Sequence, residues 1–217
     1  MNLAKKVTLA ASVMFAMALT LSCSSDDDNG GSSFNENSQI YKEDDTPITN
    51  DGVIKMRFTQ DDEYTCANEV EVGSVTNGVV TLDSPLPVPP EDCLIISSQP
   101  PFDCSSWPED LKSADAEFIL YEGEESMGRL EMIYFEGETF RETAKYAYSK
   151  KNATITCNDS FEFEGWTETI IFNMNVKTGW NKLYEQTKVN AANKNATVKG
   201  NTSSNILTKE LKWILFN

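Results

Sequence analysis

The sequence predicts an all-β fold, and three observations carry this prediction. Short runs of β-branched and aromatic residues recur along residues 51–217, and turn residues separate them. Helical periodicity is almost absent from the same part of the chain. The pair Asn77-Gly78 lies between two β-branched runs, which is the strongest short signal for a β-hairpin. About ten strands at this spacing are typical of a single β-sandwich, and a lipocalin-like β-barrel is the alternative.

The strands can be placed in order along the chain. Residues 53–58 alternate apolar and basic side chains, as a half-buried strand does. The clearest strand, residues 167–176, is rich in β-branched residues and phenylalanine. The other strands are expected at residues 70–75, 79–82, 94–96, 117–121, 129–135, 143–149, 153–157, 180–184 and 211–216.

Three segments predict irregular backbone. Four prolines place a loop at residues 84–90. Residues 97–115 are also expected to be irregular, with one helical turn after Pro108. Residues 190–205 are rich in Asn, Lys and Thr, and this composition predicts a polar loop.

The N-terminus has the pattern of a secretory signal peptide. Lys5 and Lys6 form a short basic region, and residues 7–21 are uncharged and largely apolar. This run is shorter than the ~20 residues that span a bilayer core, and no basic stop-transfer segment follows it. A permanent transmembrane helix is therefore the weaker interpretation, and we expect residues 1–22 to be removed on export.

The residues around the expected cleavage point resemble a lipobox, in which a cysteine receives a diacylglycerol thioether before cleavage. Residues 19–23 are Leu-Thr-Leu-Ser-Cys, so the small Ser22 directly precedes Cys23. The sequence departs from the usual pattern at Thr20, where a leucine is common. The resemblance implies a lipid anchor at Cys23 with acyl chains such as palmitate. An ordinary cleavage site before a cysteine is the alternative.

The segment after the cysteine resembles the acidic export signal of Bacteroidota-type surface lipoproteins. The residues that make up this signal are Ser24, Ser25, Asp26, Asp27 and Asp28. The resemblance implies an outer-membrane protein displayed on the cell surface, and the periplasmic face of the membrane is the alternative. The same Ser/Asp/Gly tract has the composition of a solvated tether.

These observations divide the chain into a signal peptide at residues 1–22, a lipid-anchored tether and linker at 23–50, and one β-sandwich domain at 51–217. Cleavage removes two of 18 basic residues and none of 34 acidic residues, so the net charge changes from −16 to −18. Such a surface repels nucleic acid and anionic lipid headgroups. We therefore expect no nucleic-acid partner. The expected partners are the membrane, reached through the lipid anchor, and a glycan or envelope protein.

Four cysteines remain besides Cys23, and an even number in an exported chain predicts two disulfides. Four cysteines allow three pairings. Cys93 and Cys104 enclose only ten residues, so we expect a short Cys93–Cys104 staple and a longer Cys66–Cys157 bridge. A zinc site of four thiolates is the alternative, but no two cysteines have the C-x-x-C spacing of metal ligands. We expect no metal and no cofactor.

The sequence contains no catalytic motif. It has no histidine, which excludes Ser-His-Asp and Cys-His arrangements. The motifs G-x-S-x-G, G-x-x-x-x-G-K and G-x-G-x-x-G are absent as well. We therefore expect a non-catalytic binding or structural module of the cell envelope, without catalytic residues. A glycan hydrolase or lyase that uses two carboxylates is the alternative, but the abundance of acids selects no particular pair.

Trp107 is the one candidate ligand contact. It lies in a proline-flanked loop next to Cys104, and a rigidly held tryptophan can stack on a sugar or anchor a protein contact. Tryptophan is highly buried on average, so a role in capping the β core is the favoured interpretation.

Overall fold

The structure is a computed structural model that describes residues 38–59, 69–96, 103–163 and 165–217. These residues form fourteen strands and two short 3₁₀ helices, which confirms the predicted all-β fold. The strands are β1 (Ser38–Lys42), β2 (Gly52–Thr59), β3 (Val70–Thr76), β4 (Val79–Leu82), β5 (Ile95–Ile96), β6 (Cys104–Ser106), β7 (Lys112–Glu122), β8 (Glu125–Glu136), β9 (Phe140–Ser149), β10 (Ala153–Phe163), β11 (Trp166–Val176), β12 (Gly179–Asn190), β13 (Asn195–Asn201) and β14 (Lys212–Phe216). The helices are η1 (Glu91–Cys93) and η2 (Ser204–Ile206).

All fourteen strands belong to one mixed sheet, in the order β5-β7-β2-β3-β4-β1-β14-β8-β9-β12-β13-β11-β10-β6. The pairs β1–β14 and β11–β13 are parallel, and the other pairs in the described residues are antiparallel. Because β7 also pairs with β8, the seven strands from β7 through β2, β3, β4, β1 and β14 to β8 form a closed circuit of pairings.

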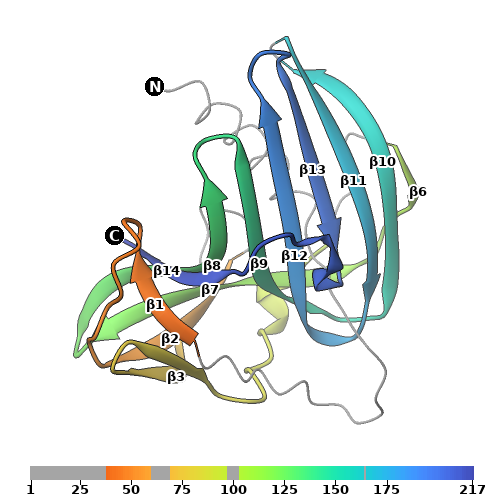
Figure 1. The fold of residues 1–217 in the computed structure, drawn as a ribbon. Coiled ribbons are helices and arrows are strands. Elements are labelled where there is room, and N and C mark those ends of the chain that lie inside the picture. The colour runs from red at the N-terminus through yellow and green to blue at the C-terminus, as the bar shows by residue number, and fades with distance from the viewer. Residues whose placement is uncertain (1–37, 60–68, 97–102, 164) are drawn as a thin grey trace.

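Strand β9 joins this circuit to the rest of the sheet. Its residues 140–144 pair with β8, and its residues 146–149 pair with β7. Its other edge pairs with β12, from which the sheet continues through β13, β11 and β10 to the short edge strand β6. Figure 1 shows these long strands as a curved group beside the circuit.

Two clusters of buried side chains correspond to these two parts. The first cluster gathers residues of the circuit strands with Ala144 and Tyr146 of β9, and it includes the fully buried Phe58. The second cluster comes mainly from β9 to β13 and includes Ala147 of β9 and Phe172 of β11. Successive side chains of a strand point to opposite faces, so β9 contributes to both cores from its two sides.

The predicted hairpin at Asn77-Gly78 is confirmed. These two residues join β3 to β4 with φ angles of 50° and 77°, as a two-residue type I′ turn requires. A Cβ atom at Gly78 would lie 2.0 Å from the carbonyl oxygen of Ile48, so only glycine fits at this position.

The expected linker at residues 23–50 is wrong for residues 38–50, which belong to the fold. Strand β1 begins at Ser38 and pairs with both β4 and β14. Ile40 is fully buried and Ile48 is 5% exposed. The segment is short, and it is held by a strand from the opposite end of the chain, so its own sequence carries little strand signal.

Two segments expected to be irregular also contain strands. The polar segment 190–205 includes β13, which lies inside the sheet between β11 and β12 because Ala196, Val198 and Gly200 alternate with polar residues and are buried. Residues 97–115 include β6 and the first residues of β7.

The structure contains a disulfide between Cys104 of β6 and Cys157 of β10, which are partners in the sheet register. The predicted bridges Cys93–Cys104 and Cys66–Cys157 are therefore wrong. Cys93 is fully buried and disulfide-bonded, and Cys66 lies outside the described residues. The short spacing between Cys93 and Cys104 in the sequence does not predict their pairing. Strand β5, which follows Cys93, and strand β6, which begins at Cys104, lie at opposite ends of the strand order.

Candidate functional site

Of the sequence-predicted site residues, the structure describes Trp107 and the cysteines 93, 104 and 157. Cys23 and the acidic signal at residues 24–28 lie outside the described residues. Trp107 is half-buried and packs against the second core cluster, as expected of a core cap, and its ligand contact stays a prediction. No helix in the described part of the chain is long and apolar enough to span a membrane. The same residues contain no group of three or more His, Cys, Asp or Glu side chains that could hold a metal ion.

Among the described residues, the carboxyl groups of Glu142 in β9 and Glu168 in β11 are buried. Glu142 accepts hydrogen bonds from the Gln186 amide at 2.6 Å, from the Thr208 backbone and hydroxyl, and from the Lys209 backbone. Burial alone would raise the pKa of Glu142, but these hydrogen bonds outweigh burial and lower it. Glu142 therefore has the surroundings of a structural carboxylate.

Glu168 has the opposite surroundings. Glu168 alternates along β11 in the same phase as Ile170 and Phe172, so its side chain projects from the face that carries the second core cluster. Its side chain is 5% exposed, and its Oε1 atom has no hydrogen-bond partner in the described residues. Burial, followed by the negative charge of Glu185, raises the pKa of Glu168 to about 7.

Two further polar side chains share this face. Glu185 of β12 is directly opposite Thr143 of β9 in the antiparallel register. The Thr143 hydroxyl is buried, and no hydrogen-bond partner for it occurs among the described residues. Thr187 donates a hydrogen bond of 3.1 Å to Oε1 of Glu185. We call Glu168, Glu185 and Thr143 the acidic cluster.

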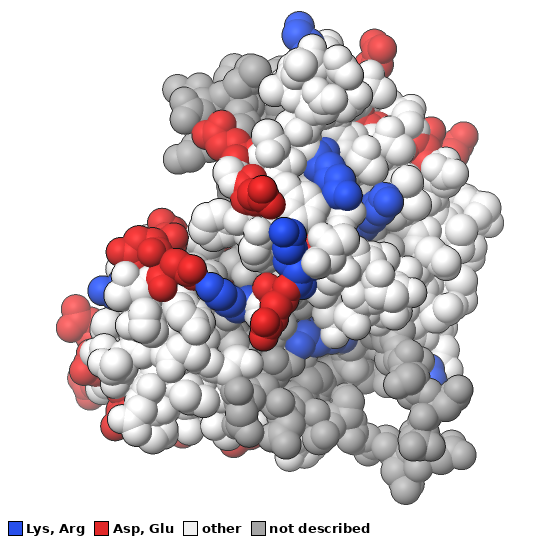
Figure 2. All heavy atoms as spheres, viewed as in Figure 1, with Lys and Arg blue, Asp and Glu red and all other residues white. Residues whose placement is uncertain are grey.

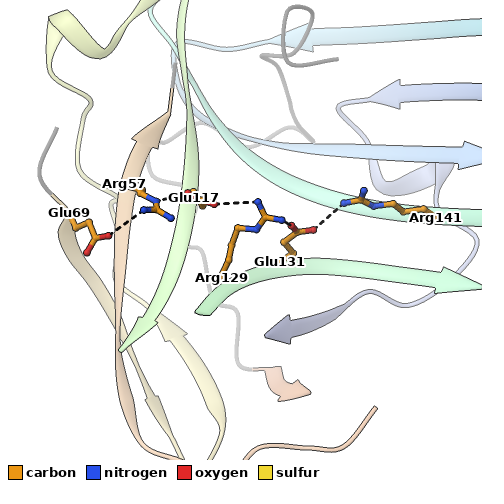
Figure 3. Close-up of polar contacts among 6 residues, drawn as sticks. All are labelled: Arg57, Glu69, Glu117, Arg129, Glu131 and Arg141. Atoms are coloured by element: carbon orange, nitrogen blue, oxygen red, sulfur yellow. Dashed lines mark hydrogen bonds and ion pairs between the residues drawn. The ribbon is translucent and has the colours of Figure 1, made fainter. Parts of the chain in front are cut away.

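A row of alternating charges leads toward the acidic cluster from the circuit. Figure 3 shows this row crossing β2, β7, β8 and β9, and its members are Glu69, Arg57, Glu117, Arg129, Glu131 and Arg141. The row ends where Arg141 pairs with Glu131 at 3.0 Å. Arg141 is two residues before Thr143 on β9, so both project from the same face.

The opposite face of the long strands has a different character. Figure 2 shows Lys and Arg side chains gathered in the middle of the viewed face, over β12 and β13. Lys182 and Lys188 project from the face of β12 opposite to Glu185, and Lys188 lies 5.4 Å from the ring centroid of Phe140. Glu185 and Thr187 alternate with these lysines, so the acidic cluster lies on the other side of the sheet.

Sequence reasoning missed Glu168, although a signal was present. Residues 166–176 (WTETIIFNMNV) place this glutamate at the same strand phase as Ile170, Phe172 and Met174, where a buried apolar residue is expected. The contribution of Thr143 and Glu185 depends on strand register, which the sequence does not state. No protein-family profile matches the chain, and neither the characterised proteins nor the solved structures include a significant match.

Proposed function

We propose that this chain is a lipid-anchored lipoprotein of the bacterial outer membrane that displays a non-catalytic, β-rich binding module at the cell surface. The observation that carries the proposal is the order of a signal peptide, Cys23 and the acidic residues 24–28. The Cys104–Cys157 disulfide is consistent with export, because disulfides persist in oxidising compartments.

The acidic cluster supports a binding role for the folded part. A buried polar group without a hydrogen bond costs about 1–3 kcal/mol, so such groups are uncommon unless a function maintains them. Glu168 and Thr143 both belong to this class within the described residues. Residues that violate the packing rules of a fold are expected at functional sites.

A hydrolase that uses two carboxylates is the second candidate. Burial and, to a smaller extent, the charge of Glu185 raise the pKa of Glu168, and a carboxyl with a raised pKa can donate a proton while a second carboxyl stays ionised. A general acid must come within hydrogen-bond reach of the substrate atom that it protonates, and Glu168 is only 5% exposed. Binding is therefore the function that the geometry favours.

The anchor can be tested by fractionating cells that express the full chain with Cys23→Ala. We expect the variant to leave the membrane fraction or to keep its signal peptide and migrate more slowly, whereas the tether control Ser33→Ala behaves as the wild type. A Cys23→Ala variant that fractionates and migrates unchanged would contradict the proposal. Protease added to intact cells tests display, since a protected wild-type domain would place the protein on the periplasmic face.

The hydrolase alternative has its own assay. Release of nitrophenol from a panel of aryl glycosides, abolished by both Glu168→Gln and Glu185→Gln, would replace the binding function with hydrolysis. Activity that survives both substitutions would exclude this pair as the catalytic residues.

A further inference from the structure

The four strands β10, β11, β13 and β12 turn one side away from the second core cluster, and we call this side the outward face. Its charge differs from that of the chain, which has 34 acidic and 18 basic residues. The charged side chains at the outward positions of these strands are Lys182, Lys188, Lys199 and Glu162. Basic residues therefore outnumber acidic ones on this face of an acidic protein.

We propose that the outward face binds an acidic polysaccharide, with Lys188 and Lys199 paired to its carboxylates and neighbouring hydroxyl and amide groups bonded to its sugar hydroxyls. The inference rests on the proposed function of a displayed binding module, and it names the ligand class of that module.

The two lysines at the centre of the proposal are available to an anion. Lys188 is exposed and Lys199 is half-buried, and neither forms an ion pair with a carboxylate in the described part of the chain. Lys188 is opposite Thr197 in the antiparallel register of β12 and β13, so Lys199 is its diagonal neighbour. Diagonal neighbours lie about 7–8 Å apart. Like charges at this distance repel, and an anion that pairs with both lysines relieves the repulsion.

The carboxylates near this face do not cancel its charge. On the adjoining strand β9 the carboxylate of the same side is Glu142, which is buried and already accepts four hydrogen bonds from protein groups. The remaining acidic residues repel a polyanion through solvent, but this repulsion is largely screened beyond the Debye length of about 8 Å at physiological salt. The local balance of charge therefore decides which ligand the face attracts.

Hydroxyl groups extend the face across the sheet from Lys188. Thr197 is opposite Lys188 on one side and Thr169 of β11 on the other. Thr169 is opposite Ser160 of β10, and their hydroxyl oxygens are 2.9 Å apart. Neighbouring strands lie about 4.8 Å apart, so this row of four residues spans about 14 Å. An extended ligand that lies across the strands would meet three hydroxyl groups and then a cation.

The neutral residues of the face fit a polysaccharide better than other polyanions. Apart from Glu162, the exposed residues on this side of β10, β11 and β13 are threonines, asparagines and a serine. Their side chains both donate and accept hydrogen bonds, as sugar hydroxyls do. The large exposed apolar side chains of the described residues lie elsewhere, on β3, β5, β8 and the loop after β4. A protein interface or membrane insertion would need such side chains, and single-stranded nucleic acid would need exposed aromatic rings.

The test titrates the whole mature chain, residues 23–217 with Cys23→Ala, by calorimetry with an oligogalacturonate. The matched neutral probe is the methyl ester of the same oligosaccharide. We expect the acid to bind about tenfold more tightly than the ester, because the ester cannot form the two ion pairs.

Two variants separate the two kinds of contact. Lys188→Gln/Lys199→Gln should weaken binding of the acid about tenfold, whereas Lys42→Gln/Lys55→Gln, which removes the same charge from β1 and β2, should not. Thr197→Val keeps the charge and the branched shape but removes one hydroxyl, so it should weaken binding of the acid about fivefold.

Three outcomes would overturn the inference: no binding of the oligogalacturonate, equal binding of acid and ester, or unchanged binding by the double variant at Lys188 and Lys199. A DNA oligonucleotide that binds as tightly as the oligogalacturonate would also overturn it, because the face would then attract any polyanion. If the double variant does not fold, the comparison of acid and ester on the wild-type protein decides. The anchor is tested separately by the fractionation of Cys23→Ala.

Discussion

Glu142 accepts two hydrogen bonds from Thr208, one from its backbone N–H at 2.8 Å and one from its hydroxyl at 2.9 Å. A side chain of β9 thereby holds the segment that leads into β14, the last strand of the circuit. The Gln186 amide bonds to the same Glu142 oxygen and also donates to the carbonyl oxygen of Ile206, so β12 takes part in the same contact.

We expect Glu142→Gln to lower the free energy of unfolding by about 2–3 kcal/mol, because it removes a charged acceptor and turns an amide N–H₂ toward other donors. The pKa of Glu142 is lowered in the folded state. The contribution of Glu142 to folding stability is therefore complete above pH 4.5, the ordinary pKa of a glutamate, and is lost as the pH falls through the lowered pKa. Urea unfolding at pH 7 measures the effect, with Glu162→Gln as control. Equal stability of the two variants would contradict it.

The raised pKa of Glu168 predicts the opposite pH dependence. The folded state favours the protonated form of Glu168. The contribution of this group to folding stability is therefore complete below pH 4.5 and is lost as the pH rises through about 7. Between those limits the loss is about 3 kcal/mol. Glutamine resembles the protonated carboxyl, so Glu168→Gln should gain stability relative to the wild type between pH 4 and pH 8. Parallel stability curves for the two proteins would refute the assignment.

Peptide mapping without reduction should find Cys104 joined to Cys157. If Cys23 carries lipid, the cysteine that remains for Cys93 is Cys66, and we expect that pair in the same map. Loss of the Cys104–Cys157 bridge, which spans 53 residues, should cost about 4 kcal/mol by the chain-entropy estimate. The double variant Cys104→Ser/Cys157→Ser measures this cost, and a stability near that of the wild type would count against the bridge.

Trp107→Ala should act on stability, because Trp107 packs against the second core cluster. The side chain is half-buried, so we expect a loss of about 2–3 kcal/mol, below the ~3–5 kcal/mol of a fully buried site. Thermal unfolding measures it. An unchanged melting temperature together with lost ligand capture would instead make Trp107 a binding residue.

The sequence predicted those parts of the fold that local composition encodes. Alternating side chains indicate β2, β-branched residues indicate β11, and the Asn77-Gly78 pair predicts the turn between β3 and β4. Strands β1 and β13 were missed because neighbours distant in the chain hold them in the sheet. The choice between sandwich and barrel stays a prediction.

The candidate site was harder to predict for the same reason. Thr143, Glu185 and Glu168 come from three strands, and only the register brings them to one face. Each residue alone is an ordinary polar residue in a chain with 34 acids. The inward phase of Glu168 on β11 was the single local indication.

The parallel pairing of β1 with β14 sets an order of events during folding. Residues 38–42 are synthesised long before their partners at residues 212–216. The circuit of seven strands therefore cannot close until residues 212–216 are available, and contacts so distant in sequence form slowly. Until then one edge of β1 is unpaired, which exposes the nascent chain to misassembly and makes the loss of residues 212–217 damaging.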